Sequence, residues 1–537
     1  MPEFLPRLRR LYGDGADQSN GHSGLRPTLK WHHLVGVTFF AVCGGDYGIE
    51  DSVGAAGPAY TMIGLLVVPW IWSLPIALMT AELGSMIPEA GGPVVWVSRA
   101  FGPFVAHQNA LIHLVANTFD NALYPVMFAD YLRAFPMLNV DGVSRWLLSF
   151  SMLAFVTVLN LLGVDTVANV STLFTVLVIS PFLVLVIAGL PTLDPSAWRI
   201  GPSTPVDWSA FISVLLWNTS GYDSVGALAA EVVDPGRNFP IGMAVSIVLV
   251  TLVYVLPVGV GVSLDVGHDF TTWTDGSFTL VAEQHVGHWL AAWISLGGAF
   301  SAFGLLNTLL CAAARIVVSS AEIGALPSSL ARIDAASGVP RAATFALSLI
   351  LAVAIVLPFA ELVEISMLFY GVAHAPPELS PPRTAHPISP RLAVPPSRPA
   401  LPPRPHPRAP STSLHLPHPA RAPHCLLWAR QVTTLAEMLA LIRLRELEPG
   451  TRRPYRVPLA NGWLLLASLP PMGLCVLLVL VARPAAWLLL ALTLGAGGLT
   501  YCLRSCRCAG DDLAAVRPHG SHPKAASPPS QGREMLM

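Results

Sequence analysis

Long apolar stretches separated by short polar segments follow one another along the chain from Trp31 to Leu503. Each is long enough to cross a hydrocarbon core of about 30 Å as a helix that rises 1.5 Å per residue. The pattern predicts an all-α membrane protein of about twelve transmembrane helices. The expected spans are 33–58, 61–83, 104–132, 145–163, 167–190, 208–232, 241–263, 288–314, 342–360, an interrupted tenth span over 361–443, 462–482 and 484–503.

Two of the predicted spans contain an interruption near their middle. Gly44 and Gly45 break the first span, and the segment "WNTSGYDSVG" places Gly221 among polar residues in the sixth. These two helices would begin the halves of a five-plus-five inverted repeat. Matching interruptions in corresponding helices are typical of secondary transporters, where unwound backbone lines a substrate site at the bilayer midplane. For each glycine alone, close helix packing is the alternative interpretation.

Carboxylates lie at the same depth as the interruptions. Asp46, Glu50 and Asp51 follow the first break, Asp223 follows the second, and Asp120 lies in the middle of the third span. Charged side chains inside a bilayer are costly, so a functional role is the default hypothesis. Helix capping is the alternative for Asp51 and Asp223, and local hydrogen bonding is the alternative for Asp120. Glu50, Asp120 and Asp223 are the candidates for proton coupling.

Aromatic side chains accompany these carboxylates. The face of an aromatic ring attracts ammonium groups and covers methylene groups, although single aromatic residues in membrane helices more often serve packing. The combination predicts a substrate site formed by Gly44, Gly45, Asp46, Tyr47, Glu50, Asp120, Asn121, Tyr124, Trp217, Tyr222 and Asp223.

Composition and charge place the chain in a membrane with a defined orientation. Of its 537 residues 53% are hydrophobic and only 12% are charged, and the mean hydropathy is +0.58, which excludes an ordinary soluble domain. Most arginines between predicted spans, including Arg99, Arg315 and Arg445, fall on the side that the positive-inside rule makes cytoplasmic. Both termini should lie on that side, and the plasma membrane is the expected location, with an endomembrane as the alternative. Glu82 and Glu231, at helix ends, should pair with nearby arginines.

The sequence contains no pattern that indicates catalysis. It has no phosphate-binding loop, no metal-ligand spacing and no nucleophile arrangement, and its seven cysteines are scattered. We therefore expect no enzyme activity, no cofactor, no metal site and no nucleic-acid partner.

A proline-rich segment over residues 375–430 interrupts the predicted tenth span. The apolar stretches on its two sides are each too short to cross a bilayer alone, but joined they have the length of one helix. We interpret the segment as a retained intron or a gene-prediction error. The alternatives are a genuine insert with the helix rebuilt from neighbouring residues, and a cytoplasmic docking segment. The expected divisions are a tail over 1–32, helices over 33–374, the insert over 375–430, further helices over 431–503 and a tail over 504–537.

Several stretches resemble a known transporter superfamily. The segments "GGDYGIEDSV", "PEAGGPVVWVSRAFGPF", "DNALYP", "GYDSVGALAAEVVDPGRNFP" and "RRPYRVPL" resemble the amino acid-polyamine-organocation superfamily, and within it the eukaryotic polyamine uptake transporters. The resemblance implies an inverted-repeat fold of about twelve helices, a substrate site between helices 1, 3, 6 and 8, and proton-coupled uptake. It matches Gly44, Gly45 and Glu50 to the broken helix 1, and Tyr222 and Asp223 to the broken helix 6. Asp46 departs from the proline expected in many relatives.

The charge around the two breaks favours a cationic substrate. Members of the superfamily also carry amino acids, whose carboxylate normally docks on the free N–H groups of a half-helix. Several carboxylates around both breaks would repel such a group. We predict a symporter that takes up polyamines of the putrescine and spermidine class with protons, by alternating access. The alternatives are an amino-acid transporter of the same fold and a metabolite sensor that does not transport.

Overall fold

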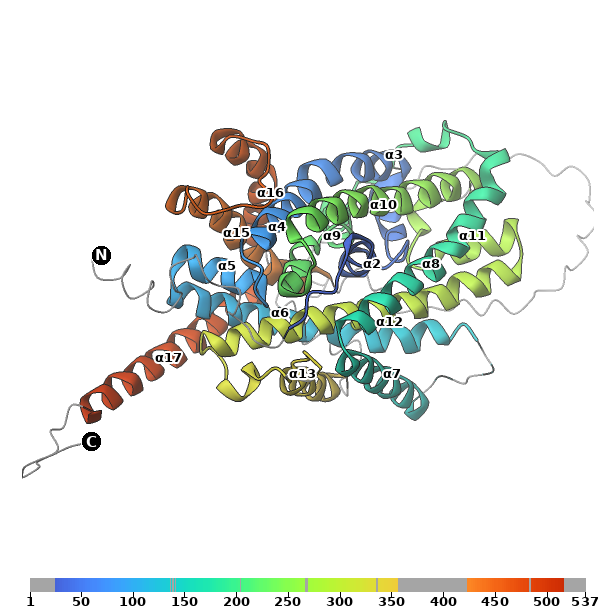
Figure 1. The fold of residues 1–537 in the computed structure, drawn as a ribbon. Helices are drawn as coiled ribbons and strands as arrows, with labels where there is room; N and C mark the ends of the chain where they lie inside the picture. Colours follow the sequence, from blue (N-terminus) through green and yellow to red (C-terminus); the bar gives the residue numbers. More distant parts are fainter. Residues whose placement is uncertain are drawn as a thin grey trace, which may run out of the picture.

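The computed structural model describes residues 25–355 and 423–515, apart from short gaps at 136, 138–139, 141, 203, 266–268, 335–336 and 482–483. Over these ranges the protein is a bundle of helices, and its only extended pairings are two isolated bridges, Leu29 with Val232 and Asp334 with Val339 (Figure 1). The predicted all-α class is therefore confirmed for this part of the chain. Residues 375–422 of the proline-rich segment lie outside the described residues, as do residues 1–24 and 516–537 of the two tails.

The helices follow the predicted order of spans. In the first half they are α2 (Trp31–Val42), α3 (Glu50–Val68), η2 (Pro69–Ser73), α4 (Leu74–Met86), α5 (Gly92–Phe101), α6 (Pro103–Leu132), α7 (Val143–Leu162), α8 (Val164–Gly189), η4 (Leu190–Thr192) and η5 (Ala197–Arg199). The second half contains α9 (Trp208–Asn218), η6 (Tyr222–Glu231), α10 (Pro235–Leu264), η7 (Phe270–Thr272), α11 (Ser277–His285), α12 (His288–Glu322), η8 (Ser328–Ala331), α13 (Arg341–Ala354), α15 (Pro423–Leu447), α16 (Asn461–Val481) and α17 (Pro484–Ala515).

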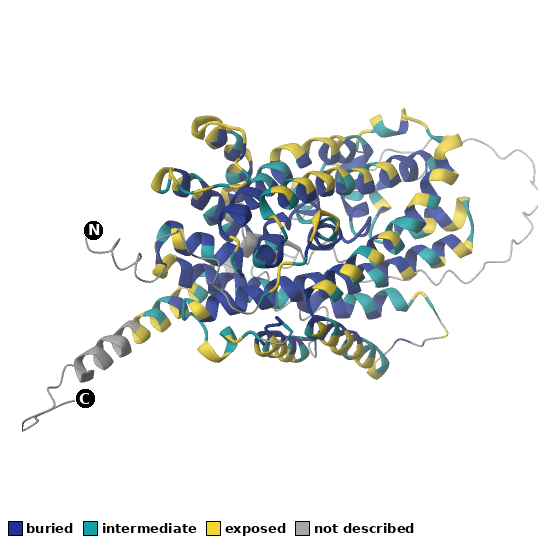
Figure 2. Cartoon of the chain, in the orientation of Figure 1, coloured by how far each residue is buried: buried dark blue, intermediate teal, exposed yellow. Residues whose placement is uncertain are grey.

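Apolar helices long enough to cross a membrane make the chain a multi-span membrane protein. In the described ranges, five stretches meet the requirements of length and apolarity: Glu50–Met86, Val143–Leu162, Val164–Thr192, Pro235–Leu264 and His288–Glu322. Trp31–Val42, Arg341–Ala354 and Asn461–Leu477 are shorter apolar helices. Large apolar side chains such as Ile63, Trp70 and Phe345 are more than half exposed on the outer faces, where Figure 2 shows the exposed residues. Such a surface suits a lipid environment.

Helix α12 forms the centre of the bundle. It packs against α6, α8 and α2, and its most apolar stretch is completely buried. Figure 1 shows α6 and α12 running beside each other through the molecule. Residues on these two helices are therefore held in fixed relation to the broken helices that pack around them.

The first predicted interruption is present. Helix α2 ends at Val42 and α3 begins at Glu50. Between them Gly44 and Gly45 adopt positive φ angles of 63° and 115°, which residues other than glycine rarely adopt. A Cβ atom on Gly45 would lie only 2.5 Å from Cγ1 of Val178. Both the backbone conformation and the close packing therefore require glycine here.

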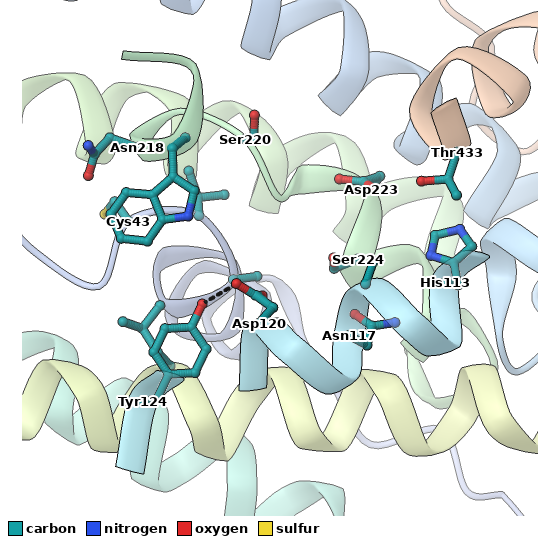
Figure 3. Close-up of a pocket in the computed structure, with 15 residues that line it drawn as sticks. Cys43, His113, Asn117, Asp120, Tyr124, Asn218, Ser220, Asp223, Ser224 and Thr433 are labelled. Carbon is teal, nitrogen blue, oxygen red and sulfur yellow. Dashed lines mark hydrogen bonds between the residues drawn. The ribbon is translucent and has the colours of Figure 1, made fainter. Parts of the chain in front are cut away.

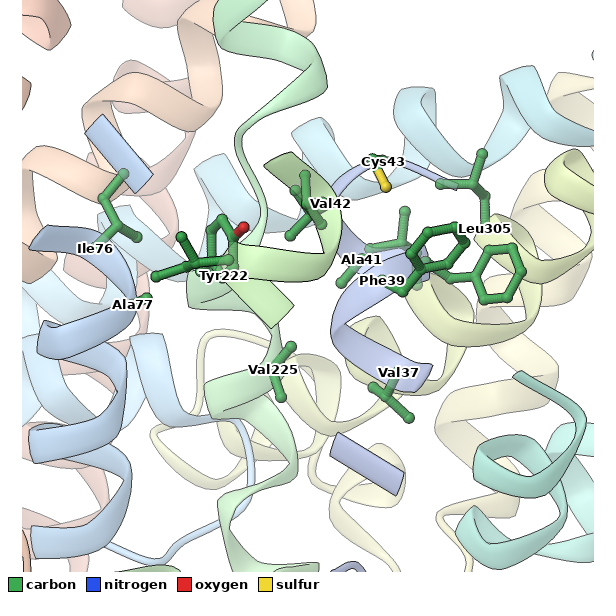
Figure 4. Packing of buried hydrophobic residues seen from close by; sticks show 14 of the residues in the cluster. Val37, Phe39, Ala41, Val42, Cys43, Ile76, Ala77, Tyr222, Val225 and Leu305 are labelled. Atoms are coloured by element: carbon green, nitrogen blue, oxygen red, sulfur yellow. The ribbon is translucent and has the colours of Figure 1, made fainter. Parts of the chain in front are cut away.

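The second predicted interruption is also present. Helix α9 ends at Asn218, Gly221 has a φ of 125°, and the chain continues as the 3-10 helix η6. The backbone of Gly226 inside η6 approaches the ring of Trp96 so closely that an added Cβ would lie 2.2 Å from it. Figure 4 shows Tyr222, at the start of η6, packed near Ile76 and Ala77.

The segment that precedes α2 is hydrogen-bonded to the end of η6. The amide groups of Thr28 and Leu29 both donate to the carbonyl oxygen of Glu231 at 2.9 Å, and the amide of Val233 donates to the carbonyl of Leu29 at 2.9 Å. These bonds join the start of one broken helix to the end of the other.

The boundary predicted between the first two spans is wrong in detail. The structure is helical from Glu50 to Met86 and contains a kink at Gly57, whose φ is 77°, in place of a loop. The reason is that Gly57 and Pro58 change the direction of the helix without ending it. At the kink the amide of Ala59 donates to the carbonyl of Ile200 and so keeps a partner. Helix α5, between the second and third predicted spans, was not expected from the sequence.

Candidate functional site

A pocket lies between the two broken helices and α6 (Figure 3). The end of α2 and the start of the first break contribute Val42 and Cys43, and the second break contributes Trp217 and Ser220. The central helix α12 contributes Leu305. The remaining lining residues are Ala41, His113, Ala116, Asn117, Asp120, Tyr124, Asn218, Asp223, Ser224 and Thr433.

Two carboxylates from different elements line this pocket. Asp120 lies in the middle of α6 and is 9% exposed, and Asp223 lies in the first turn of η6 and is 3% exposed. The hydroxyl of Tyr124, one turn further along α6, donates to Oδ1 of Asp120 at 3.0 Å. This hydrogen bond fixes the orientation of the Asp120 carboxylate toward the pocket, as Figure 3 shows.

Aromatic and small polar groups complete the lining. Trp217 lies in the last turn of α9 and lines the pocket, and a Cβ on Gly48 would contact its indole ring at 3.5 Å. The hydroxyl of Ser220 accepts a hydrogen bond from the indole N–H of Trp72 at 3.0 Å. The pocket thus combines two anionic groups with an aromatic wall and several hydrogen-bonding groups.

A second group of acids lies at the end of the bundle where α6 ends. We call Glu50, Asp51 and Asp275 the outer acidic cluster. The amide of Asp275 donates to Oδ1 of Asp51 at 3.2 Å, and the amide of Gly276 donates to Oε1 of Glu50 at 3.2 Å. The hydroxyl of Tyr131 reaches Oδ2 of Asp275 at 3.4 Å. The cluster closes this end of the bundle because it joins α3, α6 and the loop before α11.

The environment of Asp275, which lies in that loop, changes its acidity. Loss of solvent around the carboxylate raises the pKa of Asp275 to about 6, against the opposing effect of the hydrogen bonds that it accepts from Tyr131 and backbone amides. An ordinary aspartate has a pKa of about 4. This loop carboxylate therefore binds a proton at a higher pH than an ordinary aspartate does.

Buried ion pairs hold the opposite end, which we call the arginine-rich end. Arg315 of α12 binds Glu231 through two hydrogen bonds of 2.9 and 2.8 Å, with both side chains at most 2% exposed. Arg445 of α15 binds Glu82 of α4 in the same two-pronged manner, and Arg453 adds a contact of 3.4 Å to Glu82. The predicted pairing of Glu82 and Glu231 with arginines is therefore confirmed.

The structure places the predicted site residues in two groups. Asp120, Tyr124, Trp217 and Asp223 line the pocket together. The other predicted residues lie outside its lining, and their role in binding stays a prediction: Gly44, Gly45, Asp46, Tyr47, Glu50, Asn121 and Tyr222.

Local contacts explain why several of them do not line the pocket. The Tyr47 hydroxyl donates to the carbonyl of Ile294 at 2.8 Å, and the Asn121 amide donates to the carbonyl of Asn117 at 2.7 Å. Asp46 is completely buried, and neither of its carboxylate oxygens has a hydrogen-bond partner among the described residues.

Sequence reasoning missed His113 and Glu437. His113 lies on α6, and its Nε2 atom is 3.3 Å from Oε1 of Glu437 on α15. One signal was available, because His113 and Asp120 are two helical turns apart and share a face of α6. Glu437 lies one turn after Thr433 on α15, and Thr433 also lines the pocket.

Comparison with known proteins agrees with this architecture. Residues 29–374, more than half of the chain, match the family described as "Amino acid permease". The polyamine transporter PUT1 of Oryza sativa subsp. japonica is 38% identical over 307 residues, which are 57% of this chain and 57% of the relative. The polyamine transporter RMV1 of Arabidopsis thaliana is 37% identical over 302 residues, 56% of this chain and 61% of the relative.

A third relative aligns with more of the chain. The probable polyamine transporter At3g19553 of Arabidopsis thaliana is 29% identical over 488 residues, 90% of this chain and 89% of the relative. In the matches of higher identity the chain spans about six-tenths of the relatives' length. The apolar helices, the two broken segments and the family match lead to one conclusion: the chain belongs to the amino acid permease family.

Proposed function

We propose that the protein is a secondary transporter that takes up polyamines of the putrescine and spermidine class together with protons. The observation that carries the proposal is the presence of Asp120 and Asp223 in one pocket between the two broken helices. The names of the related plant proteins point to the same class of substrate.

The pocket matches the chemistry of a diamine. Hydrogen bonds from an ammonium group to a carboxylate contribute about 1.5–3 kcal/mol each, and the ring of Trp217 can cover the methylene chain between two amines. Among the described residues that line the pocket there is no lysine or arginine. A positively charged substrate can form charged hydrogen bonds with the two buried carboxylates.

Alternating access follows from the two ends of the bundle. The arginine-rich end is held by Glu231 with Arg315 and by Glu82 with Arg445, and the other end by the outer acidic cluster. Opening of one end requires its contacts to separate while the contacts of the other end remain formed. The positive-inside rule makes the arginine-rich end cytoplasmic. The complete fold in this proposal is an inverted repeat of about twelve helices in the plasma membrane, and the cycle needs no covalent chemistry.

Uptake of labelled putrescine into liposomes that contain the purified protein tests the proposal. Asp120→Asn and Asp223→Asn should each raise the KM for putrescine about 10- to 100-fold, because each removes one charged hydrogen bond worth about 1.5–3 kcal/mol. Asp207→Asn is the matched control, since Asp207 is exposed and caps α9 outside the pocket, where asparagine also caps.

Two results would overturn the proposal. One is normal putrescine uptake by both pocket variants. The other is uptake by the wild type that lysine or a neutral amino acid abolishes and that an excess of spermidine leaves unchanged.

A further inference from the structure

We propose that His113 and Glu437 form the proton-binding pair that couples substrate movement to the proton gradient. This inference rests on the proposed function, and it assigns the coupling to two residues outside the predicted set. Nε2 of His113 is 3.3 Å from Oε1 of Glu437, and the two side chains are 8% and 0% exposed. His113 also lines the substrate pocket, together with Asp120 and Asp223.

The pair lies between the pocket and the arginine-rich end. His113 is seven residues before Asp120 on α6, or about 10 Å closer to that end at 1.5 Å per residue. On α15, Thr433 lines the pocket and Glu437 lies one turn further toward Glu448, which binds Arg99 at 2.7 Å. Figure 3 shows His113 next to Thr433, at one side of the pocket. A substrate that leaves toward the arginine-rich end therefore passes this pair.

The chemistry of the pair suits a proton carrier. Histidine is the side chain that gains and loses a proton near neutral pH. When Nε2 carries a proton and the ring is positive, the pair has no net charge. When that proton leaves, the buried Glu437 carboxylate remains with a net negative charge, which is unfavourable without a new cationic partner.

Other titratable groups lie on the helices that pack around His113 and Glu437, and their charges interact with this pair or with one another. In and near the pocket these are Asp120, Asp223, Cys43 and Cys475. The groups further toward the arginine-rich end are His107 on α6, Glu82 on α4, Arg99 on α5, Arg315 on α12, Arg445 on α15, and Tyr501 and Arg504 on α17. Of these, Glu82, Arg99, Arg315 and Arg445 are held in ion pairs. The ring of His107 contacts the hydroxyl of Thr500.

The coupled cycle follows from this arrangement. A proton binds Nε2 of His113 when the pocket is open to the outer side, and Asp120 and Asp223 then hold the ammonium groups of the substrate. After the pocket opens at the arginine-rich end, the proton passes from Nε2 to water on that side. Glu437 then attracts the nearer ammonium group away from Asp223. One proton and one polyamine therefore move in the same direction.

Two assays on the full chain in liposomes separate coupling from transport. The first measures exchange of labelled for unlabelled putrescine at equal pH on both sides, and the second measures accumulation driven by a pH gradient. In His113→Gln and in Glu437→Gln the gradient-driven accumulation should fall to the level measured without a pH gradient, while exchange, although slower than in the wild type, remains measurable. The exchange rate of His113→Gln should also vary less with pH between 5.5 and 8 than that of the wild type. His107→Gln is the matched control and should retain both activities.

Each other outcome has a distinct meaning. Absence of exchange in the wild type would refute the polyamine function itself. Wild-type exchange with normal gradient-driven accumulation in both variants would refute only the role of this pair. Loss of exchange together with accumulation in monodisperse variants would also overturn the inference, because the pair would then serve binding or structure. If His113→Gln does not fold, Glu437→Gln and His113→Asn provide the same test.

Discussion

The buried pair of Glu231 and Arg315 allows a quantitative prediction. Replacement of Glu231 by glutamine removes the negative charge and one of the two oxygens that accept guanidinium hydrogen bonds. The glutamine amide oxygen and the carbonyl of Cys311, 3.1 Å from Nη1, can still accept from Arg315, but neither carries a charge. Arg315 is 1% exposed, so water cannot replace the lost partner. Removal of one partner from a buried ion pair typically costs about 3–5 kcal/mol, because an unpaired charge stays buried. We expect a decrease of this size in the free energy of unfolding of Glu231→Gln.

Unfolding of the purified protein in mixed micelles of increasing SDS content, followed by tryptophan fluorescence, measures this difference. Glu448→Gln is the comparison, because its pair with Arg99 has side chains that are 26% and 36% exposed and should contribute at most about 1 kcal/mol. The double variant Glu231→Gln with Arg315→Met should recover most of the loss, since it leaves no buried charge. A loss below about 1 kcal/mol for Glu231→Gln, or equal losses for both single variants, would refute the reasoning.

Three further predictions concern the first break, the pocket and the outer loop. Gly45→Ala should lower the yield of monodisperse protein in size-exclusion chromatography, because its Cβ would lie 2.5 Å from Val178 on a backbone with a φ of 115°; a normal yield would contradict the close packing. Tyr124→Phe should raise the KM for putrescine by up to about 10-fold, because Asp120 loses the hydrogen bond of 3.0 Å that orients it. The folded state should lose stability as pH rises from about 4 to above 6, because the pKa of Asp275 is raised to about 6 in the folded protein. Asp275→Asn should weaken this trend in thermal unfolding measured between pH 4 and 7, and an unchanged pH dependence would exclude that cause.

The sequence was sufficient to locate the two breaks and four of the fifteen residues that line the pocket. Glycines beside polar residues, paired at Gly44 and Gly45 and single at Gly221, interrupt the apolar pattern of a span and therefore indicate a break directly. Asp120 and Asp223 were identified because depth along a span can be counted from its ends. Both the breaks and the depth of these carboxylates depend only on residues that are near one another in the sequence, and the structure agrees with both predictions.

The orientation of residues within the first break could not be predicted. A regular helix has a period that relates neighbouring side chains, but residues 43–49 have no regular period. Depth therefore indicated that Asp46 and Glu50 lie near the pocket, and gave no information on the direction in which they point. Glu50 instead accepts hydrogen bonds from the amides of Gly48 and Gly276.

The pairing of His113 with Glu437 was beyond the reach of sequence reasoning for another reason. The two residues are distant in sequence and lie on opposite sides of the proline-rich segment. Their contact depends on the packing of α15 against α6, and no local pattern determines which faces of two helices meet. A single histidine in an apolar helix therefore gave no sign of its acidic partner.

The hydrogen bonds from Thr28 and Leu29 to the carbonyl of Glu231 have a mechanical consequence. A displacement of η6 pulls on the polypeptide immediately ahead of α2, so neither discontinuous helix can tilt independently of the other. Deletion of residues 1–29 would remove this tether while leaving every pocket side chain in place. The truncated protein should still bind substrate, but α2 and η6 should move less closely together than in the intact chain.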